Sequence, residues 1–242
     1  GSIAAPACYC GVYGLCPTYS RVSRYGLIDF ANSMDKIGVM AKNIEEVALM
    51  LEVISGYDEK DSTSKKIEVP KFTIKKDSKF KIAVVKESLG EGVQENVKTN
   101  LINSLKGFKY DLVSLPLNFK YSIQAYYLIS MSEASTNLAK LCGLRYGVQD
   151  KIQGDFNESF SKIRSENFSK EAKRRIILGT FARLSGFRDA YYLKALKVRT
   201  KIIEEYKALF KKYDLIITPS MPSIAPLFSE IKKMTPLQNY MS

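Results

Sequence analysis

The chain has 242 residues, of which 45% are hydrophobic and 26% are charged, and its formal net charge is +12 at pH 7. This composition is that of an ordinary globular protein, long enough to bury a sizeable core in one large domain or two small ones. No apolar run is long enough to cross a bilayer, and the N-terminus lacks the pattern of a secretory signal. The first residue is not Met, which suggests that the sequence begins partway through a longer protein.

The positive charge has two interpretations. Lysines are spread along the whole chain, with small pairs such as those at 65–66 and 211–212. Such a distribution is typical of solvated faces in a lysine-rich proteome, and it is also compatible with a nucleic-acid partner related to tRNA.

Histidine is absent from the chain, which excludes a Ser-His-Asp triad, a Cys-His dyad and a His-ligated metal within it. Three of the four cysteines are crowded at Cys8, Cys10 and Cys16. Their spacing lacks the paired C-x-x-C of zinc sites, so we expect buried free thiols in a reducing compartment and no metal site.

The first 56 residues predict short elements followed by one helix. Residues 1–40 are rich in Gly, Pro, Ser and Tyr, which predicts tight turns and short strands. In NIEEVALMLEVISGYD, Asn43 is a predicted N-cap, Glu46 completes a pair like a capping box, and Gly56 stands where a helix often stops. Residues 57–78 are polar and predict a surface connection.

A strand–helix–strand unit follows. KIAVV at 81–85 predicts a buried strand, a helix with an apolar stripe comes next, and YDLVSL at 110–115 predicts a second strand closed by Pro116. This order is typical of a crossover in an α/β sheet. The loop KESLGEGV between them lacks the glycine spacing of a phosphate-binding turn, so we reject such a site.

The second half is predicted to be mostly helical. The expected helices cover 121–142, 157–168, 170–183 and 187–213. DLIITPSMP, which follows them, predicts a strand that ends at a proline.

Several blocks of the chain resemble the amidase signature family. GSIAAPACYCGVYGLCPTYSRVSRYGLIDFANSMDKIG resembles the signature itself, and it is followed in order by DSTS, EASTNLAKLCGLRYG, KRRIILGTF, YYLKALKVR and DLIITPSMP. The SRYGL and EASTNLAK blocks resemble the branch that forms the A subunits of glutamine-dependent tRNA amidotransferases. The resemblance covers the whole chain and implies one amidase domain over 1–242, an α/β fold with a mixed, twisted sheet flanked by helices, and missing N-terminal and C-terminal parts.

The resemblance also implies the chemistry of the first residues. Ser2 aligns with the family's nucleophile, and backbone N–H groups around Gly1 would stabilise the oxyanion. Family members activate this serine with a second serine, held by a cis peptide bond, and a neutral lysine. Both of these residues precede the present sequence in the family, so we expect the isolated chain to be inactive.

Glutamine recognition is implied at two further positions. An arginine of the KRR block would bind the α-carboxylate through its bidentate fork, and we choose Arg175 over Arg174. In the tyrosine pair before EASTN we choose Tyr126 over Tyr127 as a residue of the glutamine pocket. The family's aspartate for the α-ammonium lies just beyond a Y-x-S sequence like that at 240–242.

Three positions depart from the family pattern. Ala4 stands where many members have Arg, Cys16 where Lys is usual, and Ser20 where Gly is usual. Serine is less free than glycine at positive φ, so we expect Ser20 to change the local turn.

For the whole protein, the resemblance implies the glutaminase component of a three-subunit enzyme. It would supply ammonia for the conversion of Glu-tRNA(Gln) to Gln-tRNA(Gln), of Asp-tRNA(Asn) to Asn-tRNA(Asn), or of both. The B subunit would use ATP and Mg²⁺ and make most of the tRNA contact, the C subunit would clasp the other two together, and this chain would bind no cofactor, no metal and no membrane. We expect a cytoplasmic location, or an organellar matrix in a eukaryote. The alternatives are a stand-alone amidase acting on a small or fatty amide, and an inactive fragment or interaction subunit.

Overall fold

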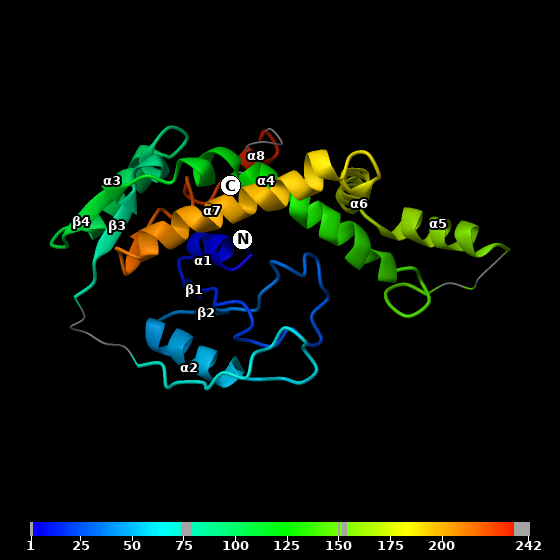
Figure 1. Cartoon of the computed structure of the whole chain (residues 1–242), viewed down its shortest axis with the longest axis horizontal. Coiled ribbons are helices and arrows are strands. Elements are labelled where there is room, and N and C mark those ends of the chain that lie inside the picture. Colours follow the sequence, from blue (N-terminus) through cyan, green and yellow to red (C-terminus); the bar gives the residue numbers. More distant parts are fainter. Residues whose placement is uncertain (1, 74–78, 150, 152–153, 235–242) are drawn as a thin grey trace. The chain divides into compact units, whose positions relative to one another are not determined.

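The computed structural model describes residues 2–73, 79–149, 151 and 154–234 (Figure 1). Contacts within the chain divide it into two compact units. The first, which we call the sheet unit, takes its described residues from 1–26, 36–119 and 205–242. The second, the helical unit, takes them from 27–35 and 120–204.

The sheet unit contains short helices and two small sheets. Its elements are α1 (Ala4–Tyr9), β1 (Tyr13–Leu15), β2 (Val39–Ala41), α2 (Ile44–Ile54), β3 (Ile82–Val85), a 3-10 turn (Lys86–Leu89), α3 (Glu95–Ser104), β4 (Tyr110–Val113), β5 (Leu215–Ile217) and α8 (Phe228–Ile231).

The larger sheet of this unit is parallel and has the order β4-β3-β5, and β3 and β4 lie beside α3 in Figure 1. Ile82 of β3 pairs with Tyr110 on one side and with Leu215 on the other. All four residues of β3 are buried, as a central parallel strand requires. The predicted crossover from the first strand through a helix to the second is therefore confirmed.

The first part of the chain forms an antiparallel pair, β1 with β2, next to α2. A small core joins them, in which Val22, Val39 and Leu51 are buried. The predicted cap of α2 is confirmed, because the side-chain oxygen of Asn43 accepts a hydrogen bond from the backbone N–H of Glu46 at 2.8 Å. With the parallel sheet and the flanking helices, this gives the expected α/β class.

The helical unit is built from α4 (Pro116–Asn137), α5 (Phe156–Asn167), α6 (Lys170–Arg183), a π-helical turn (Asp189–Leu193) and α7 (Lys194–Phe210). Of these, α4 and α7 also have residues in the sheet unit. The bounds of α6 are those predicted. The predicted start of α4 at residue 121 was wrong, since the helix already begins at Pro116, and its predicted end at 142 was too late.

The expectation of buried thiols was wrong for the clustered cysteines. Cys8, Cys10 and Cys16 are free and exposed, and Cys142 is free and half-buried. For Cys8 and Cys10 the reason is that α1 is short and buries Ala7, so the neighbours of Ala7 face outward. Among the residues that the structure describes, no group of three or more cysteine, aspartate and glutamate side chains could hold a metal ion. No described helix is long and apolar enough to cross a membrane.

Candidate active site

Ser2 lies exposed, two residues before α1, and the segment that carries it is held by two glycines. A Cβ atom on Gly14 would come within 2.6 Å of the Ala7 Cβ, and one on Gly38 within 2.2 Å of the Ile3 Cδ1. Both distances are shorter than the contacts that two non-bonded carbon atoms make in proteins. Only glycine at positions 14 and 38 therefore lets the backbone there approach Ile3 and Ala7 so closely. The two glycines thereby fix Ile3, the immediate neighbour of Ser2.

Gly1, the residue expected to contribute to an oxyanion hole, lies outside the described residues. In the described part of the chain, no lysine or carboxylate side chain hydrogen bonds to Ser2. The resemblance places the activating lysine and serine before this sequence.

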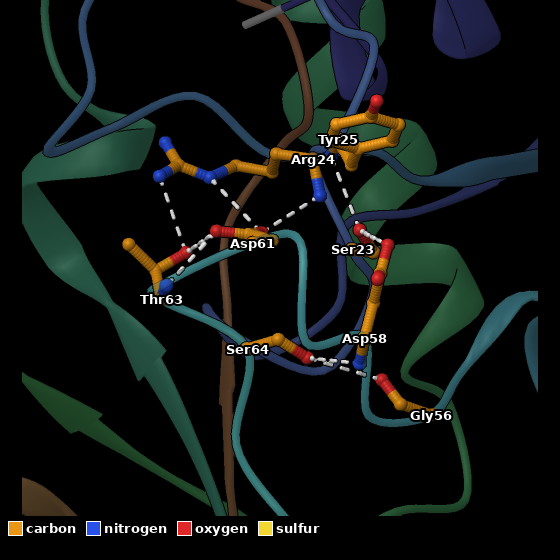
Figure 2. A network of polar contacts seen from close by, with 8 residues as sticks. All are labelled: Ser23, Arg24, Tyr25, Gly56, Asp58, Asp61, Thr63 and Ser64. Carbon is orange, nitrogen blue, oxygen red and sulfur yellow. Dashed lines mark hydrogen bonds and ion pairs between the residues drawn. The ribbon is translucent and has the colours of Figure 1, made fainter.

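A polar network then fixes the SRYG turn of the sheet unit, as Figure 2 shows. The carboxylate of Asp61 accepts hydrogen bonds from the backbone N–H of Arg24 at 2.8 Å and from the backbone N–H and hydroxyl of Thr63 at 2.9 and 2.8 Å. One guanidinium nitrogen of Arg24, Nη2, donates to the Thr63 hydroxyl at 3.2 Å. Beside them, the Ser23 hydroxyl donates to Asp58 at 2.7 Å, and the backbone N–H of Lys60 donates to the same carboxylate at 3.0 Å.

These donors keep both carboxylates ionised. Burial alone would raise the pKa of Asp61, but the hydrogen bonds from Arg24 and Thr63 outweigh it and lower that pKa below its usual value. The hydroxyl of Ser23, followed by the backbone N–H of Lys60, lowers the pKa of Asp58. The DSTS block is therefore a structural clamp on the SRYG turn, which follows the Ser2 segment in the sequence.

Ser20 lies at the start of that turn with a φ of 74°. It is the one non-glycine residue with positive φ in the ranges that the structure describes. Serine thus occupies a left-handed conformation that favours glycine, and the expected change of the turn stays a prediction.

In the helical unit, Arg175 is oriented by two neighbours. Its Nε donates to Glu171 Oε1 at 2.7 Å, one helical turn earlier, and its guanidinium lies 5.6 Å from the centre of the Phe30 ring. Arg174 holds the same carboxylate through two hydrogen bonds of 2.8 and 2.7 Å. These bonds from Arg174 and Arg175 lower the pKa of Glu171 to about 2. Within the described chain, Arg175 uses only Nε for hydrogen bonds, so both Nη groups are available to a ligand.

Tyr126 is 46% exposed on α4, and its ring meets that of Tyr127 edge-on at 5.3 Å. No hydrogen bond, ion pair or ring contact joins Tyr126 to Arg175 in the part of the chain that the structure describes. Their helices do cross: a Cβ on the buried Gly179 of α6 would lie 1.8 Å from the carbonyl oxygen of Met131 on α4. The crossing therefore depends on a glycine one turn after Arg175.

The expected site residues fall into the two units. Ser2 belongs to the sheet unit, whereas Tyr126 and Arg175 belong to the helical unit. Sequence reasoning missed Glu171 and Phe30, the neighbours that orient Arg175. Glu171 has a recognisable signal, since an acidic residue four positions before an arginine on a helix predicts an ion pair. Phe30 has none, because it reaches Arg175 from a distant loop.

Comparison with known proteins identifies the family. The model of the Amidase family matches residues 1–242. The chain belongs to the amidase family.

Within this family the chain is similar to the A subunits of glutamyl-tRNA(Gln) amidotransferase. It is 48% identical over 250 residues to that of Sulfurihydrogenibium sp., covering 100% of this chain and 51% of the relative. It is 51% identical over 233 residues to that of Staphylococcus epidermidis, covering 93% of this chain and 48% of the relative. The crystal structure of the corresponding protein from Thermotoga maritima matches 99% of this amidase chain and 48% of its own, with a TM-score of 0.75 and 36% identity. The chain thus spans about half the length of the curated relatives it matches.

Proposed function

We propose that the protein, in its full natural length, is the A subunit of a glutamine-dependent tRNA amidotransferase and that it hydrolyses glutamine to supply ammonia. The observation that carries this proposal is the 48% identity to such amidotransferase subunits over 100% of the chain, from the first residue onward. The absence of histidine is consistent with it, since the proposed chemistry needs none.

In the proposed reaction, Ser2 is the nucleophile. Its Oγ forms a bond to the side-chain amide carbon of glutamine, the C–N bond breaks, and the nitrogen leaves as ammonia. Water then hydrolyses the glutamyl ester, which releases glutamate and restores the Ser2 hydroxyl. Ser2 is exposed and its segment is packed against Gly14 and Gly38, which supports a fixed nucleophile open to substrate. The proton acceptor and the Gly1 oxyanion donor are assigned by family resemblance.

Arg175 is the proposed partner of the glutamine α-carboxylate. Its two Nη groups form a planar fork that matches a carboxylate, while Nε is held by Glu171. Arg174 is less suited, because Glu171 already engages both its Nε and its Nη2. Tyr126, half-exposed on α4, is proposed to line the pocket.

Other polypeptides complete the proposed enzyme. The B subunit would use ATP and Mg²⁺ to activate Glu-tRNA(Gln) or Asp-tRNA(Asn) and would make most of the tRNA contact, and the C subunit would join the other two. This chain would bind glutamine and no cofactor, and it would act in the cytoplasm or in an organellar matrix.

The proposal is tested on the natural-length protein co-expressed with the B and C subunits. Glutamine-dependent ammonia release should fall at least about a thousandfold in Ser2→Ala, because the acyl-enzyme can no longer form. Ser161→Ala is the matched control, since Ser161 is an exposed serine of α5 whose loss should leave the rate unchanged. Full activity of Ser2→Ala in an intact complex would refute the assignment of Ser2 as the nucleophile.

A substrate comparison separates the proposed function from a stand-alone amidase. The wild type should release ammonia from glutamine and be nearly inactive on acetamide. Arg175→Lys should raise the KM for glutamine at least about tenfold by losing the bidentate contact, and Arg174→Lys should raise it much less. Equal activity on both amides would favour the general amidase.

A further inference from the structure

The N-terminal edge of the parallel sheet carries a repeated dipeptide. Phe80 and Lys81 directly precede β3, and Phe108 and Lys109 directly precede β4. Since Ile82 pairs with Tyr110, the two dipeptides occupy matching positions on neighbouring strands, which lie about 4.8 Å apart. Two lysines are thus placed side by side at one edge of the sheet.

The third strand adds charge at the same edge. Lys212 and Tyr213 lie just before β5, on the other side of β3. Together with Lys81 and Lys109 they line a concavity of about 440 Å³ that lies entirely within the sheet unit. Three elements far apart in the sequence therefore bring three ammonium groups around one hollow.

The lysines of this hollow outnumber the carboxylates described beside them. Lys81, Lys109 and Lys212 are exposed, and the ammonium group of none of them has an acidic partner among the described residues. Among the described lining residues Asp111 is the one carboxylate, and it accepts a hydrogen bond from the Tyr213 hydroxyl at 3.0 Å. Asp214, just before β5, accepts a hydrogen bond from the backbone N–H of Lys81 at 2.8 Å. Like charges on neighbouring strands disfavour the folded state, so the arrangement suggests an anionic ligand that offsets the repulsion.

Aromatic rings accompany the lysines. Phe80 lines the hollow and is 51% exposed, and Phe108 is 61% exposed beside Lys109. Exposed rings interleaved with cations provide stacking surfaces for bases next to contacts for phosphates. A small inorganic anion has no flat apolar surface that could stack on the rings. A lipid surface would require the cations to line a protruding face, whereas here they line a hollow.

We propose that this basic-aromatic edge, made of Phe80, Lys81, Phe108, Lys109 and Lys212, binds the phosphate backbone of RNA and stacks one of its bases. This is a second site, and RNA binding there would require neither Ser2 nor glutamine. In an amidotransferase it would give the glutaminase component its own contact with tRNA, in addition to the contact proposed for the B subunit.

The test uses the natural-length protein without the B and C subunits and fluorescein-labelled total tRNA as the probe. Replacing Lys81, Lys109 and Lys212 together by Ala should weaken binding at least about tenfold at 0.1 M salt. The slope of log K against log salt should become shallower by about 2, as expected for the loss of three phosphate contacts. The matched control replaces Lys42, Lys65 and Lys71, which are equally exposed but lie outside the hollow, and it should bind like the wild type.

Two further variants separate the components of binding. Replacing the same three lysines by Arg keeps the charge and should retain binding. Phe80→Ala should weaken binding about tenfold without changing the salt slope, because it removes stacking and no charge. Equal losses in the hollow and control variants would overturn the proposal, since they would indicate binding by net charge alone.

Two competitors complete the test. Displacement of tRNA by 10 mM inorganic phosphate at constant ionic strength would identify a small-anion site and refute the RNA contact. Binding of phosphatidylserine vesicles that needs the three lysines, with tRNA binding unaffected by their loss, would identify a membrane surface instead. Glutamine hydrolysis by each variant in the complex with the B and C subunits should stay at the wild-type level. A negative result for RNA binding can therefore be distinguished from a negative result for the proposed Ser2 chemistry.

Discussion

Ser33 and Glu133 are joined by two hydrogen bonds across 100 residues of sequence. The backbone N–H of Ser33 donates to Glu133 Oε2 at 2.9 Å, and its hydroxyl donates to Oε1 at 2.6 Å. Arg199 in turn donates to the hydroxyl and carbonyl oxygens of Ser33 at 3.0 and 3.2 Å. One carboxylate of α4 and one guanidinium of α7 thus fix the loop whose Phe30 lies against Arg175. The EASTN block therefore has a structural role in addition to its family resemblance.

Glu133→Gln should destabilise the protein by about 1–2 kcal/mol, because an amide presents one acceptor oxygen where two donors now meet a carboxylate. The free energy of unfolding is measured by urea denaturation of the natural-length protein. Glu166→Gln, at an exposed position of α5, is the control and should have little effect. A cycle with Ser33→Ala should give a coupling of about 1 kcal/mol, and additive losses would show that the pair does not act as described.

The crossing of α4 and α6 makes a second prediction. Gly179→Ala should destabilise the protein by about 3 kcal/mol, because the new methyl group would lie 1.8 Å from a backbone oxygen that has no side-chain freedom to move. Glycine to alanine inside a helix normally stabilises by about 1 kcal/mol, so the expected sign is opposite to that of helix propensity. The denaturation midpoint is compared with that of Thr180→Ala, an exposed neighbour. A raised midpoint for Gly179→Ala would contradict the close crossing.

Elements that are specified by nearby residues could be predicted from the sequence. The cap of α2 by Asn43 is local and was predicted, and α6, which Ser169 caps in the structure, begins at the predicted residue. The start of α4 is not local. Pro116 is its first residue, and the carboxylate of Glu205 accepts from the next two backbone N–H groups at 3.1 and 3.0 Å. A cap supplied from 88 residues away leaves no pattern near the helix.

The same distinction holds for the candidate site. Ser2 and Arg175 were selected through family motifs, and their roles stay predictions. The groups that support them are contributed by distant segments: Gly38 against Ile3, and Phe30 against Arg175. The exposure of the clustered cysteines was missed because a helix as short as α1 has too few residues for its buried face to be read from periodicity.

The Asp61 clamp predicts a pH dependence. The pKa of Asp61 is lower in the folded state than in the unfolded state, where it is about 4. The hydrogen bonds of Asp61 therefore stabilise the fold fully above pH 4, and this stabilisation is lost as the pH falls through the folded-state pKa. Asp61→Asn should therefore cost about 2 kcal/mol at pH 7 and progressively less toward pH 3. The measurement is the denaturation midpoint of both proteins between pH 3 and 8. A gap that stays constant with pH would contradict an ionised Asp61.

The close contact between Gly14 and Ala7 can be tested by adding a methyl group at one position and removing it at the other. Gly14→Ala should lower kcat for glutamine hydrolysis, because its Cβ would push the Ala7 Cβ and with it the nucleophile segment. Adding Ala7→Gly removes the atom at 2.6 Å and should restore much of the rate, although a contact of 3.2 Å with the Ile3 carbonyl remains. Ala7→Gly alone measures the cost in helix stability, about 1 kcal/mol. A double variant no more active than Gly14→Ala would mean that the two positions do not act through this contact.

Glu171 is predicted to act on glutamine through Arg175. Glu171→Gln should raise the KM for glutamine about threefold to tenfold and leave kcat nearly unchanged, because a neutral amide holds the guanidinium less firmly than a carboxylate. The pKa of Glu171 is about 2, so the carboxylate is ionised throughout an assay between pH 6 and 9 and the ratio of KM values should not vary there. The stability that it adds is present above pH 4.5 and lost as the pH falls toward 2. It should stay below about 1 kcal/mol, because the side chain is 47% exposed. A fall in kcat at unchanged KM would show that Glu171 does not position the substrate-binding arginine.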